Sequence, residues 1–424
     1  MKVLIVGGGG REHAIAMKLA ENKAVEKLYA APGNGGMAAL CELAPIKATD
    51  VAGMVTFAQA QAIDFVVVAP DDPLCLGMVD ALKAVGIPAF GPEKNAAIIE
   101  GSKVFAKNLM KKYGIPTAAY ETFEDYDAAA AYLRDAAYPI VVKADGLALG
   151  KGVLICQDQA EALEAVASMM KENKFGASGA RVVIEEFLTG PEVSVLAFTD
   201  GKTVKPMVSS MDHKRALDHD EGLNTGGMGT IAPNPCYTEA LAERCMREIF
   251  LPTIAAMNAE GRTFRGCLYF GLMLTPKGPK VIEYNCRFGD PETQVVLPLL
   301  QSDLLTIMQA TVDGTLDKTE VRFADGAACC VVLASGGYPV KYQSGYPIAG
   351  LQEAEKTAQV FHAGTKLTEQ GVVTAGGRVL GVTATADTLR EAIDKAYAAA
   401  DQIAFTDLHR REDIGQRALL ALRQ

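Results

Sequence analysis

Long apolar segments are missing from this sequence. The longest apolar runs have the length of a strand and are interrupted by Gly or Asp, whereas a helix needs roughly 20 apolar residues to cross a bilayer. The N-terminus lacks the charged region, long apolar core and cleavage site of a secretory signal. We therefore expect neither a membrane span nor a membrane partner.

Paired cysteine motifs are missing as well. The nine cysteines are odd in number, contain no C-x-x-C motif and are scattered singly apart from Cys329 and Cys330. This pattern disfavours a disulfide framework or a zinc site and is typical of reduced thiols in a cytoplasmic protein.

The chain also has no excess of positive charge. Its net charge of −10 offers no overall attraction for nucleic acid or anionic lipid. Any phosphate group must therefore meet a local cluster of basic side chains. We expect small-molecule partners, no nucleic acid, and a monomer, with a weak dimer as the alternative.

The order of apolar segments predicts an α/β and α+β multidomain protein. A length of 424 residues predicts about two to four domains. Over residues 1–101, strand-like runs such as 2–6 and 65–70 alternate with helical patterns, which favours a parallel α/β domain.

Residues 102–325 have a different pattern, typical of antiparallel hairpins. The strand-like runs pair as 138–146 with 151–156, 181–188 with 192–201, and 266–275 with 280–286. Helical segments near 158–172 and 238–259 separate these pairs. The pattern predicts an α+β domain.

Residues 326–424 predict a small C-terminal α+β domain. Strands are expected at 326–335, 359–365 and 376–384, and a helix is expected to begin at an Asp387 cap.

The turn "GGGGREH" follows the first expected strand. In a dinucleotide-binding Gly-x-Gly-x-x-Gly motif the third glycine would fall at Glu12 or His13, and the next strand ends without a carboxylate. A nicotinamide-dependent oxidoreductase is therefore disfavoured. The remaining alternatives are an anion site at a helix N-terminus beside Arg11 and His13, or a turn without a ligand.

A second glycine-rich stretch, "KADGLALGKGV" (143–153), differs from a P-loop in spacing and in having strands on both sides. With Lys143 at its base and Lys151 at its tip, this hairpin could cover a polyphosphate. A solvated surface hairpin is the alternative. The segment 185–192 then turns between two strands. Its backbone groups could bond to the edge of a base, and Glu192 could accept hydrogen bonds from a ribose. Glutamates that are solvated or paired on an edge strand are the alternative.

The stretch "VIEYNCRFGDPETQ" (281–294) sorts by alternation along a strand. Ile282, Tyr284, Cys286 and Phe288 are expected on a core face. Glu283, Asn285 and Arg287 fall on the opposite face. Carboxylate and amide oxygens without sulfur or imidazole suit magnesium, and an edge strand with a polar face is the alternative.

The stretch 209–229 is long and polar, so we expect a functional loop without regular structure. Its carboxylate, cations and glycine backbone are suited to holding small charged substrates. A disordered linker is the alternative.

Together these motifs resemble the ATP-grasp ligases and, within them, the phosphoribosylamine–glycine ligase family. The matching stretches run through almost the whole chain: "GGGGREHA", "APGN", "EGSK", "VVKADGLALGKGV", "VIEEFLTG", "DHKR", "NTGGMG", "EYNCRFGDPETQ", "SGGYP", "FHAGT" and "GGRVL". The resemblance implies a pre-ATP-grasp domain at 1–101, an ATP-grasp domain in two subdomains at 102–325, and a C-terminal domain at 326–424.

The resemblance also implies a reaction in purine biosynthesis. ATP and Mg²⁺ (or Mn²⁺) would convert glycine to glycyl phosphate, and 5-phosphoribosylamine would displace phosphate to give glycinamide ribonucleotide. Another ATP-grasp ligase or a carboxylase acting on a phosphoribosyl precursor is the alternative. A regulatory nucleotide-binding protein would have lost Lys143, Glu283 or Asn285, and all are present.

Residue roles follow from the matching motifs as expectations. The ATP-binding residues would be Lys103, Lys143, Gly146, Gly150, Lys151, Gly152, Glu185, Glu186, Phe187, Leu188 and Glu192. The metal ligands would be Glu283 and Asn285. The substrate-binding residues would be Gly8, Gly9, Gly10, Arg11, Asp212, Lys214, Asn224, Thr225, Gly226, Gly227, Arg287 and Asp290, and the catalytic ones Lys143, Arg287 and Asp290.

Overall fold

A parallel sheet forms the N-terminal part of the computed structural model, which describes residues 1–147, 152–172 and 174–422. Its strand order is β3-β2-β1-β4-β5, and the hydrogen-bonded neighbours run parallel, as predicted. The strands are β1 (Lys2–Gly7), β2 (Lys27–Pro32), β3 (Cys41–Leu43), β4 (Phe65–Val68) and β5 (Ala89–Phe90). The accompanying helices are α1 (Gly10–Ala20), α2 (Val51–Ala60), α3 (Asp71–Leu76), α4 (Met78–Ala84) and α5 (Lys94–Gly101).

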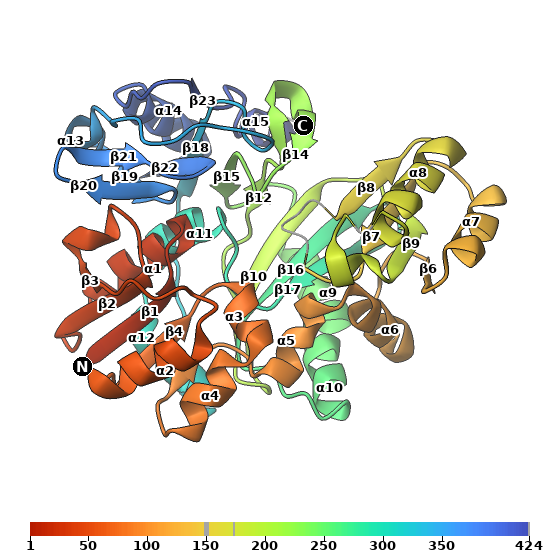
Figure 1. Ribbon diagram of the computed structural model, residues 1–424, viewed down its shortest axis with the longest axis horizontal. Coiled ribbons are helices and arrows are strands. Elements are labelled where there is room, and N and C mark those ends of the chain that lie inside the picture. Colours follow the sequence, from red (N-terminus) through yellow and green to blue (C-terminus); the bar gives the residue numbers. More distant parts are fainter. Residues whose placement is uncertain (148–151, 173, 423–424) are drawn as a thin grey trace.

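A small lobe follows, at the right of Figure 1, with a core of its own. Its sheet has the order β6-β9-β7-β8. The lobe comprises β6 (Tyr120–Phe123), α7 (Tyr126–Arg134), β7 (Ile140–Ala144), β8 (Val153–Cys156), α8 (Gln159–Met170) and β9 (Val182–Glu186), and α6 (Lys103–Tyr113) leads into it. The β7–β8 hairpin is antiparallel, as predicted.

A second four-stranded sheet, in the order β11-β10-β16-β17, stands beside this lobe. It comprises β10 (Glu192–Thr199), β11 (Val204–Pro206), β16 (Gly266–Thr275) and β17 (Gly278–Asn285), with α9 (Glu239–Cys245) and α10 (Leu251–Ala259) between β11 and β16 in sequence. The predicted pairing of 181–188 with 192–201 is wrong, because β9 and β10 belong to different sheets. Residues 187–191 therefore connect two lobes instead of closing a hairpin.

The C-terminal sheet contains strands from two distant parts of the chain. Its order is β12-β15-β18-β22-β19, with β23 paired to β18. The strands are β12 (Met211–Asp212), β15 (Gly229–Ala232), β18 (Ala327–Ser335), β19 (Gln359–His362), β22 (Arg378–Ala386) and β23 (Leu408–His409). The N-terminal cap of α14 (Leu389–Ala400) is Thr388, whose side chain accepts from the Glu391 N–H, and not the expected Asp387.

The polar stretch 209–229 also differs from the prediction of an unstructured loop. It contains β12, the start of β15 and a hairpin of β13 (Arg215–Leu217) with β14 (Glu221–Asn224). Isolated polar strands of this length have no alternating apolar pattern to reveal them. The stretch therefore reaches the cavity described below from a defined hairpin.

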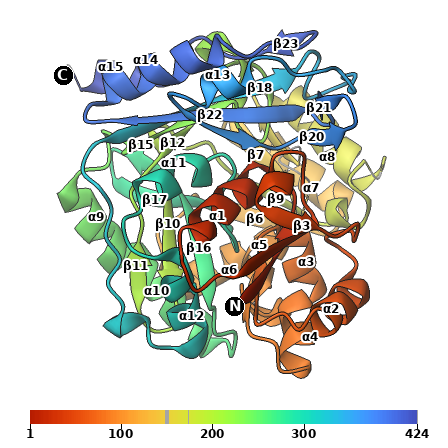
Figure 2. The same ribbon diagram turned by 90° about the vertical axis from the view of Figure 1, so that its left-hand side faces the viewer.

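Shared cores hold the large parts together. Leu4 and Val6 of β1 lie in the same apolar cluster as Phe270 of β16 and Tyr284 of β17. The helices α11 (Thr293–Leu299) and α12 (Leu304–Asp313) contribute to a second cluster with β1 and β4. Figure 2 shows the C-terminal sheet above α1 and α11. No helix among the described residues is both long and apolar enough to span a membrane.

Candidate active site

A cavity of about 920 Å³ lies between the small lobe, the second sheet and the C-terminal sheet. Most of the residues predicted for the site line it: Arg11, Lys103, Lys143, Gly152, Glu185, Glu186, Phe187, Leu188, Glu192, Asp212, Lys214, Asn224, Thr225, Gly226, Glu283, Asn285, Arg287 and Asp290. Gly150 and Lys151 lie outside the described residues. The fold thus gathers side chains from positions 11 to 290 around one space.

The N-terminal turn contributes less than expected, because Gly8, Gly9 and Gly10 do not line the cavity. A side chain at Gly8 would meet the backbone oxygen of Gly33 at 2.3 Å. The N–H of Gly9 donates to the Glu12 carboxylate at 2.6 Å and is not free for a ligand. The glycines are needed here for close packing of the turn.

The histidine of this turn also points elsewhere. His13 is buried, and its Nδ1 accepts from the backbone N–H of His362 at 2.8 Å. Burial, together with the neighbouring His362, lowers the pKa of His13 to about 3. A neutral, packed imidazole does not attract an anion, so His13 does not support the alternative of an anion site at this turn.

The strand that carries the predicted metal ligands contains a bulge. Glu283 pairs with Gly271, whereas Leu272 pairs with Val281, so Ile282 has no partner in the register. Val281 is therefore the core residue, and Ile282 lines the cavity, contrary to the prediction from alternation. Tyr284 is buried on the core side, as expected.

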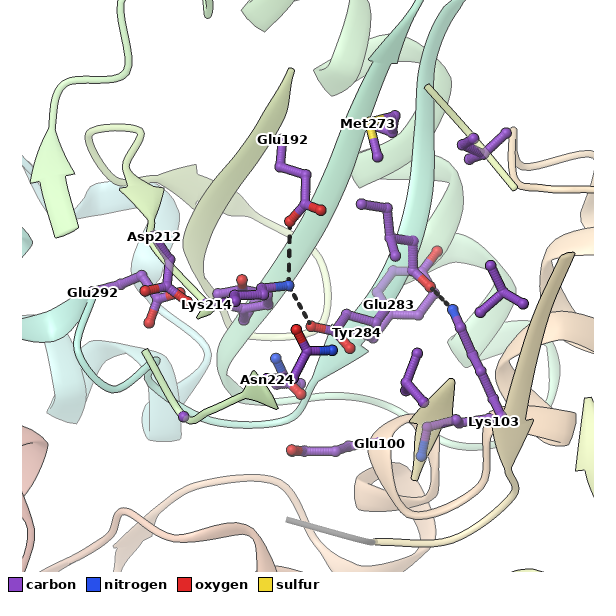
Figure 3. Close-up of a pocket in the computed structure, with 18 of the residues that line it drawn as sticks. Glu100, Lys103, Glu192, Asp212, Lys214, Asn224, Met273, Glu283, Tyr284 and Glu292 are labelled. Atoms are coloured by element: carbon purple, nitrogen blue, oxygen red, sulfur yellow. Dashed lines mark hydrogen bonds and ion pairs between the residues drawn. The ribbon is translucent and has the colours of Figure 1, made fainter. Parts of the chain in front are cut away.

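Glu283 lies among three cations. Its Oε1 is 3.6 Å from Nζ of Lys214, as drawn in Figure 3. Burial alone would raise the pKa of Glu283, but Lys214, Lys143 and Lys103 outweigh burial and lower it. Glu283 is therefore held as a carboxylate inside the cavity.

Asn285 adds an amide beside this carboxylate. In the orientation that satisfies its neighbours, the side-chain nitrogen donates to Oε1 of Glu100 at 2.9 Å and to the backbone oxygen of Tyr284 at 3.2 Å. The amide oxygen is then left as an acceptor. Among the residues that the structure describes, no three His, Cys, Asp or Glu side chains form a ready metal cluster.

Arg287, which was expected on the polar face as a substrate-binding and catalytic residue, lies beside two carboxylates. Its Nη2 lies 2.8 Å from Oε1 of Glu100 and 4.0 Å from Oδ2 of Asp71. The guanidinium lines the cavity but is neutralised by these two carboxylates. Glu100 was missed although it lies in the "EGSK" motif, because the sequence gives no sign of its distant partner.

The two predicted phosphate-binding lysines reach the cavity from different elements. Lys143 of β7 forms an ion pair with Glu185 and donates from Nζ to the backbone oxygen of Ile282 at 3.1 Å. Lys103, at the start of α6, donates to the backbone oxygen of Gly146 at 2.9 Å. Gly146 itself does not line the cavity.

Lys214 lies in the cavity between two carboxylates, those of Glu192 and Glu283. Its Nζ lies 3.3 Å from Oε2 of Glu192 and 3.6 Å from Oε1 of Glu283 (Figure 3). The carboxylates of Glu192 and Glu283 outweigh burial, which alone would lower the pKa of Lys214, and raise this pKa well above its ordinary value. The ammonium thus links the predicted ribose residue to the predicted metal ligand.

Asp212 and the buried Glu292 form an acidic pair next to Lys214 (Figure 3). Burial and the neighbouring Glu292 raise the pKa of Asp212 well above its ordinary value. Its Oδ1 has no hydrogen-bond partner among the described residues. Glu292 was not assigned a role from the sequence, because a Glu in a turn is more often solvated.

The C-terminal part of the chain fixes the glycine turn 224–227. Nη1 of Arg378 donates to the backbone oxygens of Gly226 at 2.7 Å and Asp290 at 2.8 Å. The hydroxyl of Tyr338 accepts from the N–H of Gly226 at 3.1 Å. Arg378 lies in "GGRVL" and Tyr338 in "SGGYP", but the sequence gives no sign of the turn that the two residues contact. Gly227 does not line the cavity, since Pro291 and Asp212 pack against it.

A two-lobed arrangement, with a lysine-bearing hairpin facing a carboxylate–amide strand across a cavity, defines the class of ATP-grasp proteins. Family models for phosphoribosylglycinamide synthetase match the chain in three parts: the N domain at residues 1–100, the ATP-grasp (A) domain at 101–293 and the C domain at 328–417. The chain belongs to the phosphoribosylglycinamide synthetase family.

Relatives and solved structures agree with this assignment. A phosphoribosylamine–glycine ligase of Vibrio cholerae is 50% identical over 423 residues, which is 99% of each chain. One of Halalkalibacterium halodurans is 48% identical over 99% of this chain and 97% of its own.

A crystal structure of the Thermotoga maritima phosphoribosylamine–glycine ligase matches with a TM-score of 0.86 and 34% identity, covering 98% of this chain and all of that one. The biotin carboxylase domain of a Hydrogenobacter thermophilus 2-oxoglutarate carboxylase matches with a TM-score of 0.74 at 16% identity, over 96% of this chain and 91% of that one. At that identity the likeness concerns the fold alone.

Proposed function

We propose that this protein is an ATP-dependent carbon–nitrogen ligase that joins glycine to 5-phosphoribosylamine, giving glycinamide ribonucleotide, ADP and phosphate in purine biosynthesis. The observation that carries the proposal is the cavity in which Lys103 and Lys143 lie around the same space as Glu283 and Asn285. The names of the relatives that match the full length of the chain support the same reaction.

The chemistry needs an activated carboxyl group, because a carboxylate is a poor electrophile. Transfer of the terminal phosphoryl group of ATP to glycine would give glycyl phosphate, which the amine attacks with loss of phosphate. Phosphoryl transfer requires mainly positioning and neutralisation of charge. Lys103 and Lys143 line the cavity and supply positive charge there without any need for a nucleophilic side chain.

The donor set fits magnesium. A carboxylate held in its charged form at Glu283 and an amide oxygen at Asn285 provide hard ligands from the same strand. Magnesium typically takes one or two protein ligands together with water and nucleotide phosphates, so the small number of protein donors is sufficient. A bound Mg²⁺, or Mn²⁺, would neutralise the phosphate charge during transfer.

We assign the adenine to the connection between the lobes. Phe187 and Leu188 line the cavity between β9 and β10, so their backbone groups are available to the edge of a base. Glu192 follows at the start of β10, where it would accept from the ribose hydroxyls. Glu186 also lines this end of the cavity.

Glycine and phosphoribosylamine would occupy the other end. Lys214, Asn224, Thr225 and Gly226 line that end, and Oδ2 of Asp290 lies 3.4 Å from Nη2 of Arg378. Arg11 donates from Nη1 to the backbone oxygen of Phe288 at 3.1 Å and still lines the cavity. We propose Arg11 as a contact for the phosphoribosyl group.

The test is ADP release from purified protein with Mg-ATP, glycine and freshly generated phosphoribosylamine, with each omitted in turn. The proposal requires turnover only when all are present. Turnover that ignores glycine, or that appears when bicarbonate replaces glycine, would overturn the substrate assignment in favour of another ATP-grasp reaction.

A further inference from the structure

Lys107 is a buried lysine that the proposed reaction leaves without a role. It lies one helical turn after Lys103 on α6, and only 3% of its surface is exposed. Buried ammonium groups are rare unless they are paired, because removal from water is costly. The groups around its ammonium therefore indicate what Lys107 contributes to the site.

The ammonium of Lys107 has two uncharged hydrogen-bond partners and one charged neighbour. Its Nζ donates to Oγ1 of Thr117 at 2.8 Å and to the backbone oxygen of Ala118 at 2.9 Å. It also lies 2.9 Å from Oε2 of Glu185 as an ion pair. Glu185 is therefore the carboxylate that balances the charge of this buried lysine.

Glu185 is shared between two lysines. Its Oε2 faces Lys107, and its Oε1 forms the ion pair with Lys143. The three side chains are 4%, 5% and 6% exposed, in the order Lys107, Glu185 and Lys143. Burial alone would raise the pKa of Glu185, but the two ammonium groups lower it, so its carboxylate is charged. Two positive charges and one negative charge leave a net charge of +1.

Lys143 and Lys107 both line the cavity, and they share the one carboxylate of Glu185. Nζ of Lys143 forms its ion pair with Glu185 and donates to the backbone oxygen of Ile282. Without Lys107, the charge of Glu185 would cancel that of Lys143, and the buried group would have a net charge of zero. The positive potential at the cavity wall thus depends on the pairing of Lys107 with Glu185 as well as on Lys143.

We propose that Lys107 is a positioning residue for the nucleotide: it balances the charge of Glu185, so that Glu185 does not cancel the attraction of Lys143 for the phosphates of ATP. This inference rests on the proposed function only in requiring that the cavity binds ATP. It does not depend on which acid or amine is joined.

The experiment measures binding of ATP and of uncharged adenosine by equilibrium dialysis, without glycine or phosphoribosylamine. Lys107→Met should weaken ATP binding about ten-fold, the effect of one unit charge over roughly 10 Å at an effective dielectric constant near 20. Adenosine binding should stay unchanged. Lys111→Met is the matched control, because Lys111 is an exposed lysine one turn further along α6 and its loss should change neither affinity.

The double variant Lys107→Met/Glu185→Gln separates charge from structure, because it restores the net charge of +1. It should recover most of the lost affinity for ATP, and Glu185→Gln alone should bind ATP more tightly than the wild type. If Lys107→Met does not fold, as judged by circular dichroism, Glu185→Gln still tests the charge balance.

A double variant weaker than Lys107→Met, an equal loss of ATP and adenosine binding, or weaker ATP binding by Glu185→Gln would each overturn the inference. Glycine-independent turnover would overturn the proposed function and leave this inference intact.

Discussion

Replacement of Arg287 by Met should destabilise the protein strongly, because it leaves buried carboxylates without a counter-charge. Glu100 and Arg287 have side chains only 6% and 17% exposed, and their charged atoms lie 2.8 Å apart. Asp71 lies 4.0 Å from the same guanidinium. Removing one partner of a buried ion pair typically costs about 3–5 kcal/mol of the free energy of unfolding, so we expect a loss of that size at neutral pH.

The loss should also depend on pH. Burial raises the pKa of Glu100 in the folded protein, and Arg287 opposes that rise, so the pKa rises further without Arg287. A carboxyl whose pKa is higher in the folded state favours folding below its unfolded pKa, near 4.3, and this stability is lost as the pH rises through the folded pKa. The deficit of Arg287→Met relative to the wild type should therefore shrink from about pH 7 toward pH 5.

Urea unfolding followed by far-ultraviolet circular dichroism measures this, since the chain has no tryptophan for fluorescence. The double variant Arg287→Met/Glu100→Gln should recover much of the loss, because a neutral amide replaces the unpaired carboxylate. Arg322→Met, at an exposed arginine whose side chain is 64% accessible, is the control and should change the stability little. A deficit that is equal at both pH values, with no recovery in the double variant, would refute the reasoning.

Three further substitutions test the cavity, the connection between the lobes and the core. Glu283→Gln should abolish ADP release while the circular dichroism spectrum stays unchanged, because Glu283 lines the cavity. The control Glu121→Gln, on the surface of β6, should keep full activity. Loss of the folded spectrum in Glu283→Gln would contradict the placement of Glu283 at the cavity. Gly190→Ala should destabilise the connection between the lobes and weaken ATP binding. The reason is that Gly190 has a φ of 144° and that the new Cβ would lie 2.1 Å from the backbone oxygen of Leu274. An unchanged affinity for ATP would refute this prediction. Phe288→Ala should lower the free energy of unfolding by about 3–5 kcal/mol, measured by urea unfolding, because the ring is buried in the core; a loss below about 1 kcal/mol would show that the site repacks.

Local patterns were sufficient to predict most elements of this protein. Apolar runs alternating with helical spacing predicted the parallel N-terminal sheet, and short glycine-bearing connections predicted the β7–β8 and β16–β17 hairpins. Strand alternation also placed Glu283 and Tyr284 on opposite faces. These features depend on residues that are close in the sequence, so they can be predicted from local sequence patterns.

Pairing between strands was less predictable. The runs that became β9 and β10 looked like a hairpin, because they are close in sequence and joined by Gly190 and Pro191. Instead, β9 pairs with β7 in the small lobe, and β10 pairs with β16 in the second sheet. The bulge that exposes Ile282 to the cavity likewise depends on the register with β16.

The sequence by itself determined which chemical groups the protein brings to its reaction, namely lysines in glycine-rich stretches and a carboxylate and an amide on one strand. Only the tertiary structure decided how their charges are balanced. Glu100 neutralises Arg287 across 187 positions, and Lys107 meets Glu185 from a different element. The physical reason is that the energy of a buried charge depends on the distances to its neighbours and on the exclusion of water, and both quantities exist only once the chain has folded.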